Sequence, residues 1–442
     1  MHIQLSDHFT YKKLAQFTIP SIGMMIFTSI YGVVDGLFVS NFVGKTPFAA
    51  INLIMPYLMM LSIVGFMIGN GGNALIGRYM GEGDRKKANE LFSLLVWVSF
   101  VVGTLLAVVG FLTIRPISVW LGAEGEMLEY CVSYGNVMIA VQVAFIWQCE
   151  FQSFCVVAEK PRMGLYITVA AGLTNIVLDA LFVAVFRWGL MGAAWASAIS
   201  QIVGGVIPVV YFARPNSSAL RLVKPRWYGR DMLKTCTNGS SEMVSNLSMS
   251  LVNMLYNFQL MKLAGENGVA AYGVIMYVNF IFVGIFLGYS FGVAPVVSYH
   301  YGAQNHPELK SLRQKSLNLV GLGAIVLTAA AMVLATPLAR IFVGYDPELL
   351  EMTCHGFRVY AVSYLFMGLN MFGSSFFTAL NNGLISAVIS FARAFLFQVA
   401  AILVLPGLWG LDGVWLSIVV AELLSLGLTV VCLAANQKRY QY

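Results

Sequence analysis

The sequence predicts an all-α integral membrane protein, with twelve transmembrane helices in two pseudo-symmetric six-helix lobes around a central cleft. Of its 442 residues, 59% are hydrophobic and 10% are charged, which leaves too little polar surface to cover a water-soluble protein of this size. Twelve apolar runs are long enough to cross a bilayer as helices. The second half of the chain also repeats the first.

Each half is predicted to hold six spanning helices, because open strands would leave backbone groups without hydrogen bonds in lipid. The predicted spans of the first half are 14–40, 48–76, 91–114, 127–156, 163–186 and 191–213. Those of the second half are 232–263, 269–298, 316–339, 352–379, 384–405 and 411–435. Residues 1–213 are therefore predicted to form an N-lobe, 214–231 a cytoplasmic linker and 232–442 a C-lobe.

An internal repeat relates the two lobes. Residues Trp188–Gly192, which read WGLMG, return as Trp409–Gly413, which read WGLDG, at a displacement of 221 positions. Pairs of small residues follow the same displacement without a gap, Ala158 with Ala379 among them. Small residues let helices approach closely where no hydrophobic force drives their packing. Because six spans return the chain to its starting side, both lobes should share one orientation about an axis along the membrane normal.

The basic residues predict which side of the membrane is cytoplasmic. Of 26 Lys and Arg, nineteen fall on the inner side if the N-terminus is inside, five fall outside, and Arg358 and Arg393 lie within spans. Loops rich in Lys and Arg stay in the cytoplasm, so both termini are expected there. The net charge of +6 is thus explained by orientation, and no nucleic-acid partner is expected.

Two acidic residues lie where a membrane protein rarely tolerates them. Asp35 and Asp179 are each about two helical turns inside the outer ends of their predicted helices. Asn175 precedes Asp179 by four residues and shares its helix face, while Tyr134 and Ser197 lie at a similar depth. Ionisable groups inside spans are functional candidates by default, so these five residues form the predicted cation-coupling site.

The acids are confined to the first lobe, since the repeat aligns Asp35 with Tyr256 and Asp179 with Ala400. No basic residue of the N-lobe is predicted at their depth. Either a cation binds there or one carboxyl carries a proton, because like charges repel strongly at low dielectric. Oxygen ligands from Asp35, Asn175 and Asp179 suit Na⁺ and serve H⁺ equally well. The structural alternative is that the acids cap a neighbouring helix or hydrogen-bond to Tyr134 and bind no ion.

Three further charges are predicted in the C-lobe. Glu242, Arg393 and Glu422 are each about three turns from the inner ends of their helices. We expect them to neutralise one another as a buried ion-pair network, which is costly unless it is well hydrogen-bonded. The alternative is a relay for substrate or protons.

Several segments resemble the multidrug and toxic compound extrusion (MATE) family. They are the Val-Val-Asp-Gly-Leu-Phe-Val run around Asp35, the spacing of Asn175 and Asp179, and the inner turns Gly81–Asp84 and Glu159–Arg162. The resemblance covers essentially the entire chain, including its duplicated twelve-helix layout. It is closest to the branch of bacterial DNA-damage-inducible and archaeal members.

This resemblance implies roles for individual residues. Asp35 and Asp179 would couple transport to Na⁺ or H⁺, Asn175 and Ser197 would add oxygen ligands, and Tyr134 would support the site. Ser197 stands where relatives often have threonine, and it keeps the hydroxyl. Pro20 matches a proline that bends helix one in that branch. The other branch uses acids in helices seven and ten; because helix ten here offers Asn370 and no Asp, a second cation site is not expected.

Together these features predict a secondary active multidrug efflux transporter that exchanges bulky amphipathic or cationic organic compounds for Na⁺ or H⁺ by alternating access. No nucleophile and base occur at a credible spacing for an enzyme, and no cofactor is expected beyond the coupling ion. We expect a monomer in the plasma membrane of a prokaryote, in contact with lipid and small organic substrates. The candidate residues for the substrate cavity are Asn52, Tyr57, Met60, Asn279 and Phe282.

The alternative from another functional class is a flippase for lipids or cell-wall precursors on a related duplicated scaffold. Phosphate-bearing headgroups usually need a strongly cationic cavity, and the central helices are nearly free of Lys and Arg, with Arg393 the main exception. A passive channel is disfavoured, because no segment resembles a repeated selectivity filter.

Overall fold

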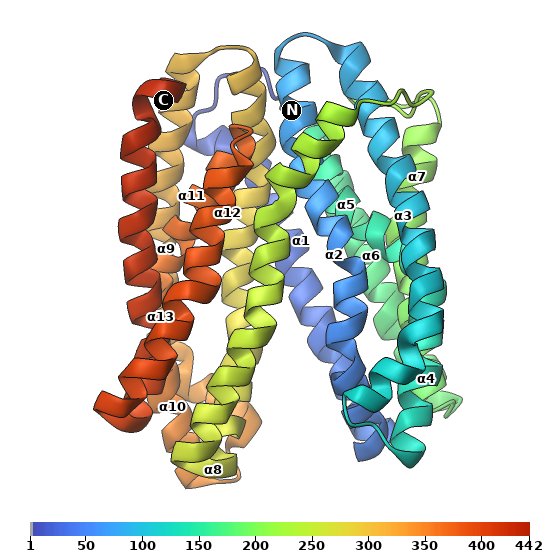
Figure 1. Ribbon diagram of the computed structural model, residues 1–442, viewed down its shortest axis with the longest axis vertical. Coiled ribbons are helices and arrows are strands. Elements are labelled where there is room, and N and C mark those ends of the chain that lie inside the picture. Colours follow the sequence, from blue (N-terminus) through green and yellow to red (C-terminus); the bar gives the residue numbers. More distant parts are fainter. Residues whose placement is uncertain (1–2) are drawn as a thin grey trace.

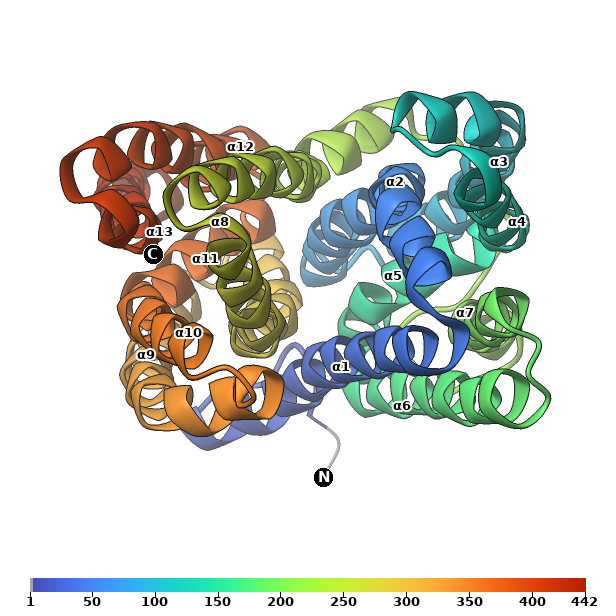
Figure 2. The same ribbon diagram turned by 90° about the horizontal axis from the view of Figure 1, so that it is seen from below.

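The computed structural model describes residues 3–442, apart from the side chains at positions 36, 37, 40, 41 and 45, and within this range the chain is helical and contains no strand. Figure 1 shows two bundles of long helices side by side, with both termini at the same end of the molecule. We call this end the terminal end. Viewed from the opposite end, α1, α2 and α8 lie toward the middle, between the remaining helices of the two lobes (Figure 2).

The spans of the N-lobe alternate in direction and are joined by short turns. The helices are α1 (Tyr11–Phe38), α2 (Lys45–Gly81), α3 (Arg85–Trp120), α4 (Gly125–Ala140), α5 (Gln142–Val157), α6 (Pro161–Asp179) and α7 (Leu190–Ala213). Two π-helical segments extend α1 and α6, namely η1 (Val39–Val43) and η2 (Ala180–Val185). The pair α4 and α5 is bent by 59° and is long and apolar enough, taken together, for one span.

The C-lobe repeats this arrangement. Its helices are α8 (Gly229–Gly302), α9 (His306–Val343), α10 (Pro347–Ala361), α11 (Tyr364–Ala379), α12 (Gly383–Phe391), the π-helical η3 (Ala392–Leu396) and α13 (Phe397–Tyr440). Gly265 divides α8 and Gly410 divides α13, since both have non-helical backbone angles. With α10 and α11 in the place of α4 and α5, the described chain has the predicted twelve spans.

Several helices extend further than their apolar runs predict. α3 begins at Arg85 instead of residue 91, and α9 begins at His306 instead of 316. The side chains of Asp84 and Asn305 cap these starts by accepting hydrogen bonds from the backbone N–H groups of the first turn. A hydropathy criterion ends a span where charges begin, whereas a capped helix continues beyond the hydrocarbon core.

The backbone supports the internal repeat and corrects its register. Gly189 and Gly410 have nearly the same angles, with φ of 60° and 58° and ψ of −140° and −132°, a region that glycine adopts readily. The turns after α5 and α11 are also equivalent, with positive φ at Glu159 and Asn381. These two residues are 222 positions apart, so the gap-free pairing of Ala158 with Ala379 is wrong by one residue.

Glycines bring the two lobes into close contact near the terminal end. A Cβ atom added to Gly71 would lie 1.9 Å from the carbonyl oxygen of Thr235, and one added to Gly239 would lie 1.9 Å from that of Met67. Such distances are too short for any larger residue. We refer to this contact between α2 and α8 as the seal.

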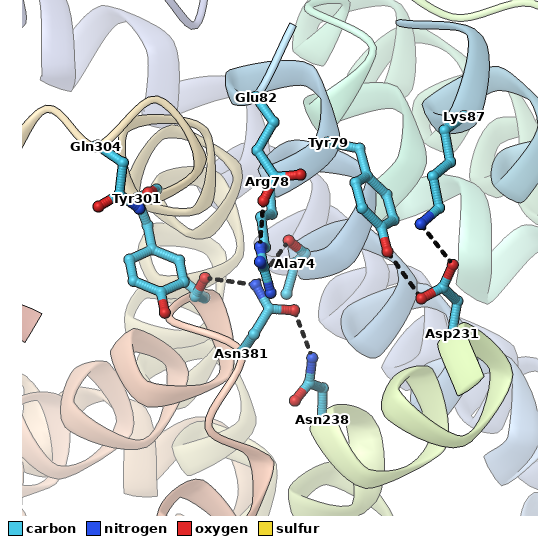
Figure 3. Close-up of polar contacts among 11 residues, drawn as sticks. Ala74, Arg78, Tyr79, Glu82, Lys87, Asp231, Asn238, Tyr301, Gln304 and Asn381 are labelled. Carbon is cyan, nitrogen blue, oxygen red and sulfur yellow. Dashed lines mark hydrogen bonds and ion pairs between the residues drawn. The ribbon is translucent and has the colours of Figure 1, made fainter. Parts of the chain in front are cut away.

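Polar contacts reinforce the seal, as Figure 3 shows. The Tyr79 hydroxyl donates to Asp231 Oδ1 at 2.8 Å, and Lys87 Nζ lies 3.4 Å from Asp231 Oδ2. Asn381 joins the lobes as well, because its Nδ2 donates to the Ala74 carbonyl and its Oδ1 accepts from Asn238. The lobes are therefore closed against each other at the terminal end.

Candidate cation and substrate site

A cavity of about 540 Å³ lies between the two lobes, lined by residues of both. Among the described side chains, the charged ones on its lining are Asp35, Glu242, Arg393 and Glu422. Its volume falls in the range of small-molecule binding sites. The acids of the N-lobe and the charges of the C-lobe therefore face one common space.

The structure brings the five predicted N-lobe residues together. Asp35 is half-buried on α1 and lines the cavity, while Asp179 is completely buried at the end of α6. The Asp35 carboxyl faces Asp179, Asn175 and Ser197, and Asn175 Nδ2 donates to Ser197 Oγ at 3.3 Å. Tyr134 is buried and lies close enough to feel the charges of both acids.

Several oxygen atoms of this cluster are buried without a hydrogen-bond partner. They are Asp35 Oδ1, Asn175 Oδ1 and both carboxylate oxygens of Asp179. Among the described side chains, no Lys, Arg or His forms an ion pair with either acid. A buried carboxylate without a partner is costly, so this cluster is chemically suited to take up a proton or a hard cation.

Each group of charged site residues lies beside a π-helical segment, a feature that hydropathy does not reveal. Asp179 immediately precedes η2, Asp35 lies one turn before η1, and Arg393 lies within η3. A π-segment adds one residue to the helical turn, and such segments often occur at functional sites. The sequence signals for these positions were the intramembrane charges, their asymmetry under the repeat and the family resemblance, none of which predicts a π-segment.

The C-lobe charges form a pair and one separate acid. Arg393 Nη1 lies 3.0 Å from Glu422 Oε1, and Asn370 Nδ2 donates to Glu422 Oε2 at 2.8 Å. Asn370 is held in turn by the Thr429 hydroxyl. Glu242 makes no ion pair among the described residues, although it is close enough to feel the charge of Arg393. Arg393 thus forms an ion pair with one of the two acids, Glu422, and interacts with Glu242 only at longer range.

Glu242 lies at the end of the cavity nearest the seal. One stripe of α8 lines the cavity, and its members are Glu242, Ser245, Asn246, Met249, Val252, Asn253 and Tyr256. Asn238, one turn before Glu242, belongs to the seal. Tyr256, the repeat counterpart of Asp35, lies about 21 Å from Glu242 along this helix, at 1.5 Å per residue.

Most predicted cavity residues lie elsewhere. Asn279 is on the lining, but Asn52, Tyr57, Met60 and Phe282 are not. Tyr57 contacts Thr113 on α3, Met60 is 56% exposed on the outer surface of its helix, and Phe282 stacks on Tyr364 at 5.1 Å. Asn52 donates to the Phe48 carbonyl of its own helix.

The α2 residues that do line the cavity are Met55, Met59 and Phe66. A change of one position turns a helical side chain by about 100°, and the apolar sequence of α2 does not distinguish its cavity face from its lipid face. Among the residues that sequence reasoning missed, Tyr256 had a signal, because the repeat places it opposite Asp35.

Pro20 is buried within α1. Its ring removes one backbone donor, yet α1 runs without a break from Tyr11 to Phe38. The bend of helix one at this residue stays a prediction.

Comparison with known families identifies the scaffold. The family model MatE matches residues 20–181 and again residues 243–403, one match in each lobe. The chain belongs to the MatE family. As a MatE protein it is a member of a family of multi-pass membrane transporters, and the two matches agree with the internal repeat.

Individual relatives of this MatE chain are distant in sequence but similar along their whole length. The multidrug export protein MepA of Staphylococcus haemolyticus (strain JCSC1435) is 23% identical over 413 residues, which cover 93% of this chain and 90% of that protein. A crystal structure of MATE in complex with MaL6 superposes with a TM-score of 0.91 at 21% identity and covers 98% of this chain and 97% of that one. An outward-facing conformation of a multidrug resistance MATE family transporter gives 0.90 at 21% identity, with the same coverage. The MatE chain thus has the MATE transporter fold.

Proposed function

We propose that this protein is a secondary active multidrug efflux transporter that exports bulky amphipathic or cationic organic compounds in exchange for Na⁺ or H⁺. The observation that carries this proposal is the pair of acids Asp35 and Asp179, whose buried oxygens lack partners beside a cavity of drug size. The name of the MepA relative, a multidrug export protein, supports the same class of substrate.

The positions of the two acids suggest the order in which an ion binds. Asp35 is on the cavity lining and Asp179 is buried behind it, so an entering cation meets Asp35 first. Na⁺ would be held by carboxylate oxygens of both acids and by the Asn175 amide oxygen, with Ser197 adjacent. A proton would instead be shared between the two carboxyl groups. Either ion neutralises a site that the protein leaves without a counter-charge.

The cavity lining is suited to varied organic cations. Its methionines adapt to ligands of different shape, and its aromatic rings attract cations. The methionines on the lining are Met25, Met55, Met59, Met138, Met249, Met276 and Met367. Because Glu422 neutralises Arg393, Glu242 is the acid on the C-lobe wall that remains available to a positively charged nitrogen.

Exchange follows if ion and drug favour different states of one cleft. With the seal closed at the terminal end, ion occupancy of Asp35 and Asp179 would favour the cleft open to the other side and help to expel the drug. Loss of the ion would permit return. The excess of Lys and Arg at the terminal end supports a cytoplasmic location for both termini, in the plasma membrane of a prokaryote, and we propose a monomer.

A flippase for lipids or cell-wall precursors fits the cavity less well. The headgroups of such substrates carry phosphate, and the arginine on the described lining is already paired with Glu422. The lining would therefore attract cations and repel phosphate.

Dye export from vesicles tests the proposal. Purified protein is reconstituted into liposomes, and movement of ethidium against its gradient is followed under an imposed Na⁺ gradient and then an imposed pH gradient. We expect wild-type protein to export the dye under at least one gradient. Asp35→Asn or Asp179→Asn should slow export about tenfold or more, since each variant loses one of the carboxylates that bind the coupling ion.

A matched control removes an acid far from the cavity. Glu266 is exposed at the end of the molecule opposite the seal, so Glu266→Gln should export dye at the wild-type rate. Correctly inserted Asp35→Asn and Asp179→Asn variants that export dye as fast as this control would refute the assigned coupling site. A wild-type protein that exports no dye under either gradient would refute the function.

A further inference from the structure

The segment before α1 crosses the terminal end and contacts both lobes. Residues 3–10, which we call the strap, are not helical. Leu5 and Phe9 are completely buried and belong to the main hydrophobic core, whereas His8 between them is exposed. The strap is therefore a packed part of the fold, with its polar side chains toward solvent.

One anchor of the strap is in the C-lobe. Glu308, in the first turn of α9, accepts a hydrogen bond from the Phe9 backbone N–H at 2.9 Å through Oε1, and its Oε2 lies 2.6 Å from His8 Nδ1. Lys315 Nζ donates to the Phe9 carbonyl. The Phe9 ring meets the ring of His300 edge to face, with centroids 6.4 Å apart.

The other anchor is in the N-lobe. The Leu5 backbone N–H donates to Glu159 Oε1 at 2.8 Å. Glu159 lies in the turn between α5 and α6 and has a positive φ of 62°, a conformation uncommon for a residue with a side chain. The strap thus joins a turn of one lobe to the start of a helix in the other.

The distance between the two anchors limits how far the lobes can separate. Leu5 and Phe9 are four residues apart, and a fully extended chain covers at most about 3.6 Å per residue. If the seal opens at the terminal end, the turn at Glu159 and the start of α9 move apart. The strap then has to release one of its two anchors.

We propose that the strap is a latch that stabilises the state closed at the terminal end, and that a proton on His8 tightens it. The inference rests on the proposed function for the alternating-access motion and for the cytoplasmic side. Imidazole gains or loses its charge in the physiological pH range, and a charged imidazole forms a stronger bond to a carboxylate than a neutral one. The latch therefore holds more firmly as cytoplasmic pH falls.

Charged groups of both signs surround His8, and the acidic one is in direct contact with it. Glu308 faces it directly, and Lys315 on α9 binds the neighbouring carbonyl. His300 on α8 lies beneath the strap and feels the charges of both Glu308 and His8. Within the N-terminal segment, Asp7 is already paired with Lys13 at 3.3 Å, which leaves Glu308 as the carboxylate in contact with His8.

Hydrogen exchange of the full-length protein tests the latch without using transport. Amide protection is measured by mass spectrometry at about pH 6 and about pH 8, corrected for intrinsic exchange rates, in peptides that contain the strap and in the seal peptide around Gly239. In wild-type protein we expect strap exchange to be slower at the lower pH by on the order of threefold or more.

Three variants separate the latch from a passive packing contact. Glu308→Gln keeps an oxygen that can accept from the Phe9 N–H but removes the charge that faces His8, so it should weaken strap protection at about pH 6, abolish its pH dependence and raise exchange in the seal peptide at that pH. His8→Gln should show weak protection that no longer depends on pH. Glu348→Gln is the matched control, since Pro347-Glu348-Leu349 repeats the Pro307-Glu308-Leu309 context in the first turn of α10 and Glu348 is exposed; it should behave as wild type.

Unchanged strap protection in Glu308→Gln would overturn the proposal, and so would a wild-type pH response in His8→Gln. The second variant keeps the test valid if the first fails to fold, because His8 is exposed and its replacement disturbs no packing. A wild-type protein that exchanges as expected but exports no dye would refute the proposed function and leave the latch intact.

Discussion

At the scale of single residues, the distinctive feature of the two N-lobe acids is that buried carboxylate oxygens lack hydrogen-bond partners. Asp179 is fully buried, and neither of its carboxylate oxygens has a hydrogen-bond partner in the described structure. The sequence indicated this residue because charges inside spans are rare. It could not indicate that Asp35 would lie on the cavity lining and Asp179 behind it, because that difference depends on how α1 and α6 pack together.

Thermal stability should report ion binding to this pair. Na⁺ or H⁺ that binds only the folded state stabilises it, so the Tm of wild-type protein should rise when Na⁺ replaces choline at alkaline pH, or when the pH falls. Asp179→Asn should remove most of this response and raise the Tm in ion-free buffer, since it removes a buried charge without a partner. Differential scanning fluorimetry of both proteins measures this. If the Tm of the variant responds to Na⁺ and to acid as strongly as the Tm of the wild-type protein, the ion binds elsewhere.

The two C-lobe glutamates should differ in what their removal costs. Glu422→Gln leaves Arg393 without its ion-pair partner in a mostly buried position, so we expect a loss of about 3 kcal/mol in unfolding free energy. Glu242→Gln breaks no ion pair and should leave stability nearly unchanged while weakening ethidium binding about tenfold. Denaturation curves and dye-binding titrations on the two variants measure these effects. A large stability loss in Glu242→Gln would mean that this acid is structural.

At the scale of elements, hydropathy predicted that the helices exist but not how they are interrupted. The spans and their order follow from apolar length, and the ends of α3 and α9 differ because capped polar turns continue the helices. The bend between α4 and α5 and the segments η1, η2 and η3 have no local signature, since no proline or glycine lies within the three π-segments. A single sequence therefore does not reveal them.

The seal depends on glycine at the contact between α2 and α8. Gly71→Ala would place a methyl group against the Thr235 carbonyl, so the helices must move apart at a cost of about 1 to 3 kcal/mol. Gly321→Ala is the control, because a Cβ added there on α9 would meet no atom within 4 Å beyond its chain neighbours and the nearby backbone of its own helix, and alanine favours a helix. We expect Gly71→Ala to lower the Tm and to increase hydrogen exchange around Gly239, and Gly321→Ala to do neither. Wild-type exchange in Gly71→Ala would show that the contact is not tight in the membrane.

At the scale of the whole molecule, the internal repeat made the two-lobe architecture predictable. The difference between the lobes at the positions of the two acids indicated the coupling site. Matching glycines at 189 and 410 set the same turn in each lobe, and the repeat counterpart of Asp35 is the buried Tyr256. The cavity lies between the lobes, so its lining depends on how two bundles face each other. This explains why the acid cluster could be predicted from one lobe alone, while Asn52, Tyr57, Met60 and Phe282 were wrongly assigned to the cavity lining.

The number of carboxylates at the proposed coupling site, Asp35 and Asp179, limits the electrical charge imported in each cycle. Two carboxylates accept at most two positive charges, either one Na⁺ or up to two protons. Release of a monovalent drug against one Na⁺ would be electroneutral, whereas release against two protons would move one net charge inward and gain about 2.3 kcal/mol per 100 mV of membrane potential. The dependence of drug efflux on membrane voltage would thus indicate how many ions Asp35 and Asp179 bind in each cycle.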